Sequence, residues 1–215
     1  MKKILSILLV SVLLIGCSEN RVLLDELTNK GTKDSQLMYS EGKLFNGIGF
    51  DVYSNGKLKS EVNYKDGKKD GLHNSWNYNG QLKSEYNYED GNPNGLQKSW
   101  YENGQLKKEA NIKDGYEDGI WKYYYDNGEL KYQNNFKDGG LYGLQKGWYP
   151  NGQLEYESNF WGGMGNECNK GWYENGQLEF EENFKDHKED GIWKYYYDNG
   201  QLKRELNYKD GKLIN

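Results

Sequence analysis

The stretch "YYYDNGELKYQNNFKDG", residues Tyr123 to Gly139, decides the fold, because its two halves alternate around an Asn-Gly pair. A near copy, "YYYDNGQLKRELNYKDG", lies at Tyr195 to Gly211. An Asn-Gly pair between two alternating runs is the strongest short-range signal for a β-hairpin. The chain therefore contains the same hairpin pattern more than once.

The Asn-Gly pair recurs seven times at a constant spacing of 24 residues. The asparagines of these pairs, which number the repeats 1 to 7, are Asn55, Asn79, Asn103, Asn127, Asn151, Asn175 and Asn199. Each unit is rich in Tyr, Trp and Gly, which is typical of β-structure. We predict an all-β fold, an elongated single-layer antiparallel meander of tandem 24-residue β-hairpin repeats that occupies residues 41–215 with a C-terminal cap.

Turn chemistry and charge predict how the strands pair. We expect Asn-Gly to form a two-residue type I′ turn, and "KDGKKDG" at Lys65 to Gly71 to form a longer return turn. Counting outward from the two-residue turn, the residue five before each Asn faces the residue six after it. This register gives four opposite-charge pairs, Lys98–Glu109, Lys146–Glu157, Lys170–Glu181 and Lys194–Glu205.

Each face of the predicted sheet carries a row of aromatic residues. The residues three before each Asn form the tryptophan row: Val52, Trp76, Trp100, Tyr124, Trp148, Trp172 and Tyr196. The tyrosine row, two before each Asn, contains Tyr53, Tyr101, Tyr125, Tyr149, Tyr173 and Tyr197 and is expected on the opposite face, together with the leucines three after each Asn. Tyr and Trp suit interface anchors, so the aromatic members of the tryptophan row are candidate partner-binding residues. Alternatively, both rows only stabilise the single-layer sheet.

The first segment, "MKKILSILLVSVLLIGC", has the order of elements of an export signal. Lys2 and Lys3 precede an apolar run of 12 residues, Ile4 to Ile15, which is too short to span a bilayer. The run ends in Leu14-Ile15-Gly16-Cys17, which resembles the lipobox of bacterial lipoproteins. That resemblance implies a signal peptide over residues 1–17, lipidation of Cys17 and export to the outer membrane, its periplasmic side or the cell surface.

Residues 18–40 lie outside the repeat period and are expected to form a tether followed by a capping strand, "QLMYS". If Cys17 carries lipid, Cys168 has no intramolecular partner, and we expect it to pack as a small apolar residue. It belongs to an aliphatic row seven before each Asn, which contains Ile48, Leu72, Leu96, Ile120, Leu144, Cys168 and Ile192.

Composition argues against several kinds of partner. The formal net charge is −5 and no basic cluster is present, so binding to nucleic acid and adhesion of the repeats to anionic lipid are not expected. The lipid on Cys17 is then the membrane contact. Similar repeats with open sheet ends leave edge-to-edge self-association possible.

We predict no catalytic residue, metal site or cofactor. His73 and His187 occupy different positions of distant repeats, and the glutamates of the repeats are better explained as partners of lysine on a solvated face. "WGGMGNECN", Trp161 to Asn169, superficially matches a calcium nonapeptide, but only one copy is present. We interpret it as a locally altered turn, with Trp161 as a further candidate contact.

The unit in Trp100-Tyr101-Glu102-Asn103-Gly104-Gln105-Leu106, repeated from Trp172 to Leu178, resembles the bacterial MORN-repeat variant. The resemblance covers roughly Gly42 to Gly211. It implies a structural or binding module, and such proteins are usually labelled YwqK-family antitoxins of toxin–antitoxin systems. The lipobox departs from what an antitoxin of a cytoplasmic toxin needs.

The favoured function is a membrane-tethered, non-enzymatic scaffold that binds another protein through an aromatic-rich sheet face. One alternative is an antitoxin-like partner that neutralises a small neighbouring protein. Another is a cell-surface glycan binder, which requires at least three exposed aromatic residues in one row. An enzyme would require a converged pocket, which a flat repeat sheet rarely offers.

Overall fold

The structure is a computed structural model that describes residues 20–30, 36–161 and 164–214, without the side chains of residues 161–167. The expected signal peptide with Cys17 lies outside the described residues. Within them, no helix is long and apolar enough to cross a membrane.

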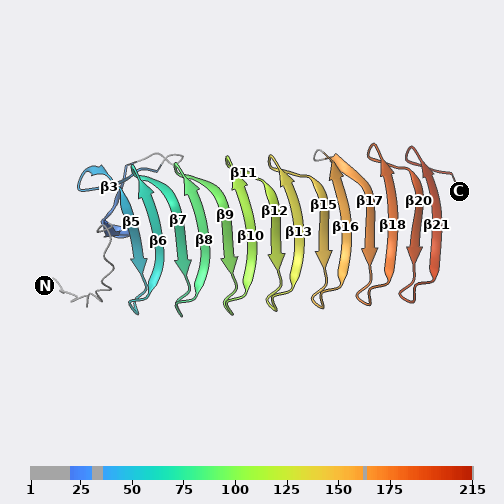
Figure 1. The fold of residues 1–215 in the computed structure, drawn as a ribbon, viewed down its shortest axis with the longest axis horizontal. Helices are drawn as coiled ribbons and strands as arrows, with labels where there is room; N and C mark the ends of the chain where they lie inside the picture. Colours follow the sequence, from blue (N-terminus) through green and yellow to red (C-terminus); the bar gives the residue numbers. More distant parts are fainter. Residues whose placement is uncertain (1–19, 31–35, 162–163, 215) are drawn as a thin grey trace.

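One long sheet runs through all seven repeats, and each repeat contributes two neighbouring antiparallel strands (Figure 1). The prediction of an all-β, single-layer meander is confirmed. The long strands are β5 (Gly47–Val52), β6 (Leu58–Lys65), β7 (Lys68–Trp76), β8 (Leu82–Glu89), β9 (Asn92–Trp100), β10 (Leu106–Lys113), β12 (Gly119–Tyr124), β13 (Leu130–Lys137), β15 (Gly143–Trp148), β16 (Leu154–Trp161), β17 (Met164–Trp172), β18 (Leu178–Lys185), β20 (Gly191–Tyr196) and β21 (Leu202–Lys209). Short strands follow the second turn at β11 (Tyr116–Glu117), β14 (Gly140–Leu141), β19 (Lys188–Glu189) and β22 (Lys212–Leu213).

The predicted register is confirmed at all four charged pairs. Lys98 lies opposite Glu109, and Lys146 lies opposite Glu157. The same holds for Lys170 with Glu181 and for Lys194 with Glu205.

The prediction of a two-residue turn at Asn-Gly is wrong. In repeat 3 the Gly104 N–H donates to the Tyr101 carbonyl at 2.9 Å, so the turn begins one residue earlier than expected. Gly104 has a φ of 86°, whereas none of the seven asparagines is among the described residues with positive φ. This pattern is that of a type I turn followed by a glycine bulge. The Asn103 side chain fixes the turn, because its Oδ1 accepts the Gln105 N–H at 3.0 Å and its Nδ2 donates to the Asp126 carbonyl of the next repeat at 2.6 Å.

A bulge next to the turn restores the predicted register. Trp100 lies opposite Leu106, but Ser99 lies opposite Lys108, so Lys107 is one extra residue in the second strand. The extra loop residue and the bulge residue compensate each other, which is why the charged pairs fall where the shorter turn predicts them. The bulge also corrects the predicted place of the leucines, because Leu106 and Trp100, as opposed residues, share one face.

The two-residue type I′ turn occurs instead at Asp-Gly. Lys65 pairs with Lys68, and the two residues between them, Asp66 and Gly67, have φ values of 49° and 76°. A type I′ turn requires positive φ at both central residues. The return turn predicted to be the longer one is therefore the tighter one.

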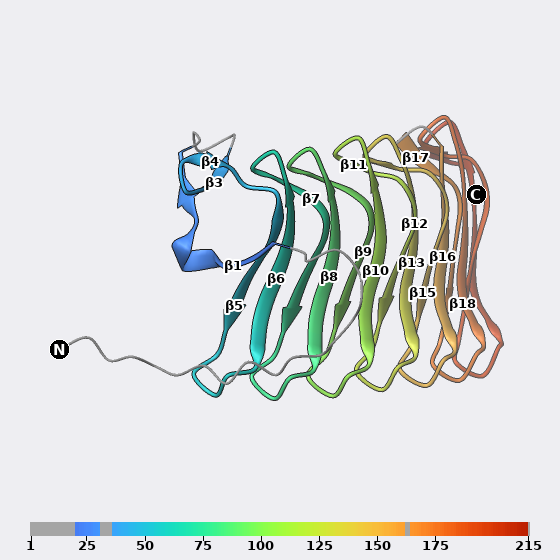
Figure 2. The same cartoon turned by 60° about the vertical axis from the view of Figure 1, so that its left-hand side comes forward.

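The sheet is bent into a trough, and Figure 2 shows the strands curving around the side on which the N-terminal segment lies. We call this side the concave face and the other side the convex face. Leu24 and Leu27 contact Gly49 on the concave side, where a Cβ on Gly49 would lie 2.6 Å from Leu24 Cδ2. Because the tryptophan and aliphatic rows alternate with Gly49 along the strand, they lie on the convex face.

The N-terminal segment caps the first repeat. Sequence reasoning places a tether first, but β1 (Arg21–Leu23) pairs in parallel with β5 and is followed by a 3-10 turn at Leu24–Glu26. Leu27 of this segment is buried, and so are Phe45 and Val62 in and before the first repeat. The strand expected at "QLMYS" is present as β3 (Met38–Ser40), between β2 (Thr28–Asn29) and β4 (Lys43–Leu44).

Candidate functional site

The convex face carries three parallel rows of side chains along the array. The aliphatic row lies nearest the Asp-Gly turns, the Lys–Glu pairs form the middle row, and the tryptophan row with its opposing leucines lies nearest the Asn-Gly turns. Apolar rows therefore flank a charged row.

The six candidate residues of the tryptophan row occupy equivalent positions at the ends of their strands. All six are half-buried: Trp76, Trp100, Tyr124, Trp148, Trp172 and Tyr196. Each has a leucine opposite it, as Trp148 has Leu154. The structure thus aligns the candidates in one row, and none of them is fully exposed.

The tyrosine row joins neighbouring repeats. In five repeats the tyrosine hydroxyl donates to the main-chain carbonyl of the tryptophan-row residue in the next repeat, at 2.7–2.9 Å. These donors are Tyr53, Tyr101, Tyr125, Tyr149 and Tyr173. For the tyrosine row, the interpretation that the aromatic residues stabilise the sheet is therefore the better one.

The aliphatic row is the most exposed apolar feature of the convex face. Five of its members are 38–49% exposed, namely Leu72, Leu96, Ile120, Leu144 and Ile192. Ile48 in the first repeat is only 8% exposed. Cys168 is half-buried, and burial raises the pKa of its thiol, which favours the protonated form.

The middle row consists of ion pairs between adjacent strands. Lys146 Nζ lies 2.5 Å from Glu157, and Lys170 Nζ lies 2.8 Å from Glu181, whose hydrogen bond raises the pKa of Lys170. Lys98–Glu109 and Lys194–Glu205 are longer, at 3.7 and 3.9 Å. Partly exposed pairs of this kind contribute about 0–1 kcal/mol each, so they set the register more than they stabilise the fold.

On the concave face, the Gln and Trp residues that stand six before the Asn of their repeats bond to the main chain of the preceding strand. These bonds lie near the Asp-Gly turn, where the main-chain pairing between the two strands is interrupted. Gln97 Nε2 donates to the Asn87 carbonyl at 2.9 Å, and Trp121 Nε1 donates to the Asn111 carbonyl at 2.9 Å. Gln145 and Trp193 make the equivalent bonds to Asn135 and Asn183. Gln and Trp therefore fill the same role at this position, because each donates a side-chain N–H to the carbonyl of the equivalent asparagine.

Aromatic rings fill the concave face of the later repeats. Trp121 and Phe136 have ring centroids 4.9 Å apart, and those of Trp193 and Tyr208 are 4.8 Å apart. Tyr156 and Phe180 lie over the glycines opposite them, Gly147 and Gly171. The rings thus form the apolar layer that a single sheet otherwise lacks.

His73 occupies the concave position that Gln or Trp fills elsewhere. Its Nδ1 is buried, with no hydrogen-bond partner among the described residues. Burial, and secondarily the Lys69 charge, lower the pKa of His73 to about 4. The neutral ring contacts Tyr88, at a centroid distance of 5.9 Å.

We expect acid to destabilise the fold through His73. Above pH 6.5 the ring is neutral in both the folded and unfolded states; between pH 6.5 and about 4 only the unfolded state takes up the proton. The free energy of unfolding should therefore fall as the pH is lowered. Because solvent screens this half-buried ring, we expect a loss on the order of 1–2 kcal/mol. Urea unfolding of the native chain and of His73→Gln at pH 7 and pH 4.5 measures it. Gln is native at this position in repeats 3 and 5, so the variant should lose clearly less stability on acidification; an equal loss would contradict the assignment.

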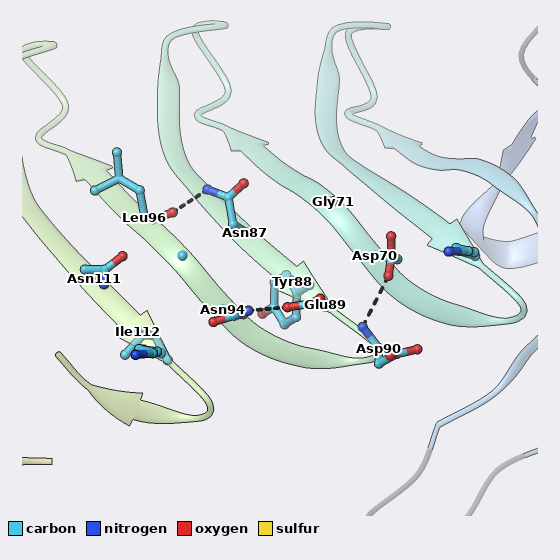
Figure 3. A pocket seen from close by; sticks show the side chains of 13 residues that line it. Asp70, Gly71, Asn87, Tyr88, Glu89, Asp90, Asn94, Leu96, Asn111 and Ile112 are labelled. Atoms are coloured by element: carbon cyan, nitrogen blue, oxygen red, sulfur yellow. Dashed lines mark hydrogen bonds between the residues drawn. The ribbon is translucent and has the colours of Figure 1, made fainter. Parts of the chain in front are cut away.

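A groove of 740 Å³ lies where the Asp-Gly turns of repeats 2 and 3 meet (Figure 3). The Asp70 carboxylate accepts the Asp90 N–H at 3.3 Å, Asn94 donates to Glu89, and Asn87 donates to the Leu96 carbonyl at 2.5 Å (Figure 3). These polar groups bind one another and link the turns. The groove therefore resembles a junction between repeats more than a reaction site.

The part of the chain that the structure describes contains no group of three or more His, Cys, Asp or Glu residues placed to hold a metal ion. His73 lies in β7 and His187 in the turn after β18, several repeats away. Trp161 ends β16 opposite Met164, but its side chain is outside the described set, as is all of Cys17. The "WGGMGNECN" segment is described only in part.

Sequence reasoning overlooked the concave row six before each Asn. The sequence did contain a signal for this row, because all its members except Gly49 carry a side-chain N–H despite their different shapes. They are His73, Gln97, Trp121, Gln145, Asn169 and Trp193. Sequence reasoning expected Cys168 to pack as a small apolar residue but did not identify the aliphatic row around it as exposed.

A family model described as a MORN repeat variant matches seven segments of the chain, at residues 45–66, 69–90, 93–114, 117–138, 141–161, 168–186 and 189–210. The search of curated proteins finds no match. The matched segments follow the seven structural repeats, so the family model and the hairpin period describe the same unit.

Proposed function

Because the chain belongs to the MORN repeat variant family, whose repeats generally form non-enzymatic scaffolds, we propose that it is a scaffold that binds another protein through its convex face. The observation that carries this proposal is the aliphatic row, in which five side chains at equivalent positions are 38–49% exposed. Each of these side chains lies opposite an asparagine of the adjacent strand, as Leu96 lies opposite Asn111, so exposed apolar and amide groups alternate along the row. Exposed apolar side chains gathered on one face and bordered by polar groups are typical of protein interaction sites.

The neighbouring rows complete a surface of the kind that protein partners use. Half-buried aromatic anchors lie across the charged row from the aliphatic row, at Trp76, Trp100, Tyr124, Trp148, Trp172 and Tyr196. In protein interfaces, aromatic residues supply much of the contact area, and the charged groups beside them help to orient the partner. In this proposal Trp161 is an additional contact in the segment that departs from the repeat pattern.

The proposal includes a membrane tether. Cys17 becomes the first residue after removal of residues 1–16 and carries lipid, and the repeats lie outside the cytoplasmic membrane. The lipobox-like Leu14-Ile15-Gly16-Cys17 and the basic and apolar segments before it support this placement. A chain with Cys17→Ala would then be recovered in the soluble fraction.

An Ile120→Glu/Leu144→Glu variant is expected to lose its protein partner while keeping its fold. The fold is kept because both positions are exposed to solvent. The partner is lost because it would have to bury the two new carboxylates, and burying an unpaired charge is costly. In-cell cross-linking of the tagged native chain and the variant, followed by affinity purification, measures the loss. We expect the urea midpoint to change little, since exposed substitutions alter stability by about 0.5 kcal/mol or less.

A matched control places the same charges at apolar residues outside the rows. Tyr116 and Leu213 are 62% and 56% exposed and lie next to Asp-Gly turns. Tyr116→Glu/Leu213→Glu should keep the partner. Equal recovery from all three chains would contradict the proposed surface, and recovery of no protein from the native chain would contradict protein binding itself.

The alternative functions are distinguished by the same measurement. Glycan binding requires three exposed aromatic residues in one row, but the six candidates of the tryptophan row are half-buried, and in the tyrosine row only Tyr197 is exposed. No observation on the described residues favours an antitoxin role. A small protein recovered in a one-to-one complex would favour it.

A further inference from the structure

In three repeats the tyrosine row is covered by a lysine of the same hairpin. Lys107 Nζ lies 5.4 Å from the Tyr101 ring centroid, and Lys131 Nζ lies 5.1 Å from that of Tyr125. Lys203 makes the same contact with Tyr197 at 5.5 Å. Each lysine stands four after the Asn of its repeat, so this position places a cation over an aromatic face.

Repeats 5 and 6 have the opposite charge at this position. Glu155 and Glu179 stand where the other five repeats have lysine, and the tyrosines of these repeats are Tyr149 and Tyr173. Within the described part of the chain, neither glutamate forms an ion pair. Burial raises the pKa of Tyr149, and the negative charges of Glu155 and Glu179 raise it further.

A hollow of 360 Å³ lies between these two repeats. Its lining includes the aromatic residues Tyr149, Tyr156 and Phe180 and the glutamates Glu155, Glu179 and Glu182. Glu182 accepts a hydrogen bond from the Tyr195 hydroxyl at 2.8 Å, which leaves Glu155 and Glu179 as the two available carboxylates. The one lysine in the lining, Lys170, is bound to Glu181 at 2.8 Å, so its charge is already neutralised. Asn169 also lines the hollow, and its Oδ1 is a buried acceptor with no partner among the described residues.

We propose that this hollow binds the basic side chains of the protein partner, lysine or arginine, in place of the lysines that repeats 5 and 6 lack. Two carboxylates beside aromatic rings complement a cation with a hydrogen-bonding head and an apolar stem. Equivalent positions of neighbouring repeats are two strands apart, about 10 Å, so the two glutamates fit two basic side chains at that separation. The inference rests on the proposed function, because it names the chemistry of that partner.

Fluorescence anisotropy with a fluorescein-labelled decalysine peptide and the full chain tests the hollow. The decisive variant is Glu155→Lys/Glu179→Lys, which restores the residue of the other five repeats and is therefore expected to fold. We expect its Kd for decalysine to rise about tenfold or more. Each new lysine would lie over the tyrosine ring of its own repeat, and its positive charge would repel the peptide. The reverse variant, Lys107→Glu/Lys131→Glu, should bind decalysine more tightly by creating a second hollow of the same kind.

A control separates the hollow from general electrostatics. Glu102→Lys/Glu129→Lys makes the same change of net charge at exposed turn residues outside the hollow, and its Kd should stay within about twofold of native. A Kd for Glu155→Lys/Glu179→Lys within twofold of native would overturn the inference. An equal rise in the control would overturn it too, since net charge alone would then explain binding.

The two proposals fail separately. If the partner is lost with Ile120→Glu/Leu144→Glu but decalysine binding does not depend on Glu155 and Glu179, the inference about the hollow is wrong and the scaffold proposal stands. If no protein is captured but the decalysine results follow the pattern above, the scaffold proposal is wrong and the cation preference of the hollow stands.

Discussion

Replacing Tyr101, Tyr125 and Tyr149 together by phenylalanine is expected to lower the free energy of unfolding by about 3 kcal/mol, about 1 kcal/mol for each hydrogen bond removed. Each hydroxyl donates to a main-chain carbonyl in the next repeat, at 2.7, 2.8 and 2.9 Å respectively. The rings remain, so the change isolates the hydroxyls. Urea unfolding followed by tryptophan fluorescence measures the effect.

The loss should also affect cooperativity, because these bonds join one repeat to the next. In a repeat array, stability is shared between units and the interfaces that couple them, so weaker interfaces broaden the transition and reduce its slope. Tyr197→Phe is the matched control, since its hydroxyl makes no such bond among the described residues. A triple variant that unfolds like this control would show that the hydroxyls do not couple the repeats.

A Gly147→Ala variant is expected to lose about 2 kcal/mol, because the new methyl group would overlap an aromatic ring in a packed layer. A Cβ at Gly147 would lie 2.2 Å from Tyr156 Cε1, far closer than van der Waals contact allows. The ring must leave its place over the glycine. Urea unfolding at neutral pH measures this loss as well.

Two comparisons make the result specific. At Gly140 φ is not positive and the nearest atom to a Cβ is 3.6 Å away, so Gly140→Ala should be nearly neutral. In a Tyr156→Ala background, where the ring is absent, Gly147→Ala should cost little or even stabilise the strand. If Gly147→Ala unfolds at the same urea concentration as Gly140→Ala, the ring does not need the glycine.

Some features of the fold follow directly from local sequence. The 24-residue spacing of the Asn-Gly pairs predicted the hairpins, and the charges of Lys146 and Glu157 predicted the register. The turn type was predicted wrongly, although one signal was present. Pro150, just before Asn151, fixes φ near −65° and suits the second residue of a turn from Tyr149 to Gly152, which the Gly152 N–H closes.

The candidate surface was only partly predictable. Period-two alternation groups residues such as Trp100 and Lys98 on one face, and the structure confirms that grouping. It does not reveal that the aliphatic row is exposed, because exposure depends on which way the sheet bends. Nor does it show that the Tyr149 hydroxyl bonds to the next repeat, which depends on the spacing between hairpins.

The sequence by itself determined the repeat, its two strands and the residues that share each face, because these depend on turns and alternation within one hairpin. The tertiary structure alone decided which face is concave, so that Trp121 is buried while Ile120 beside it is 49% exposed. Both faces carry apolar rows, so no single hairpin distinguishes them. Bending is the sum of twist and bulges over all the strands, and it crowds side chains on one face while separating them on the other.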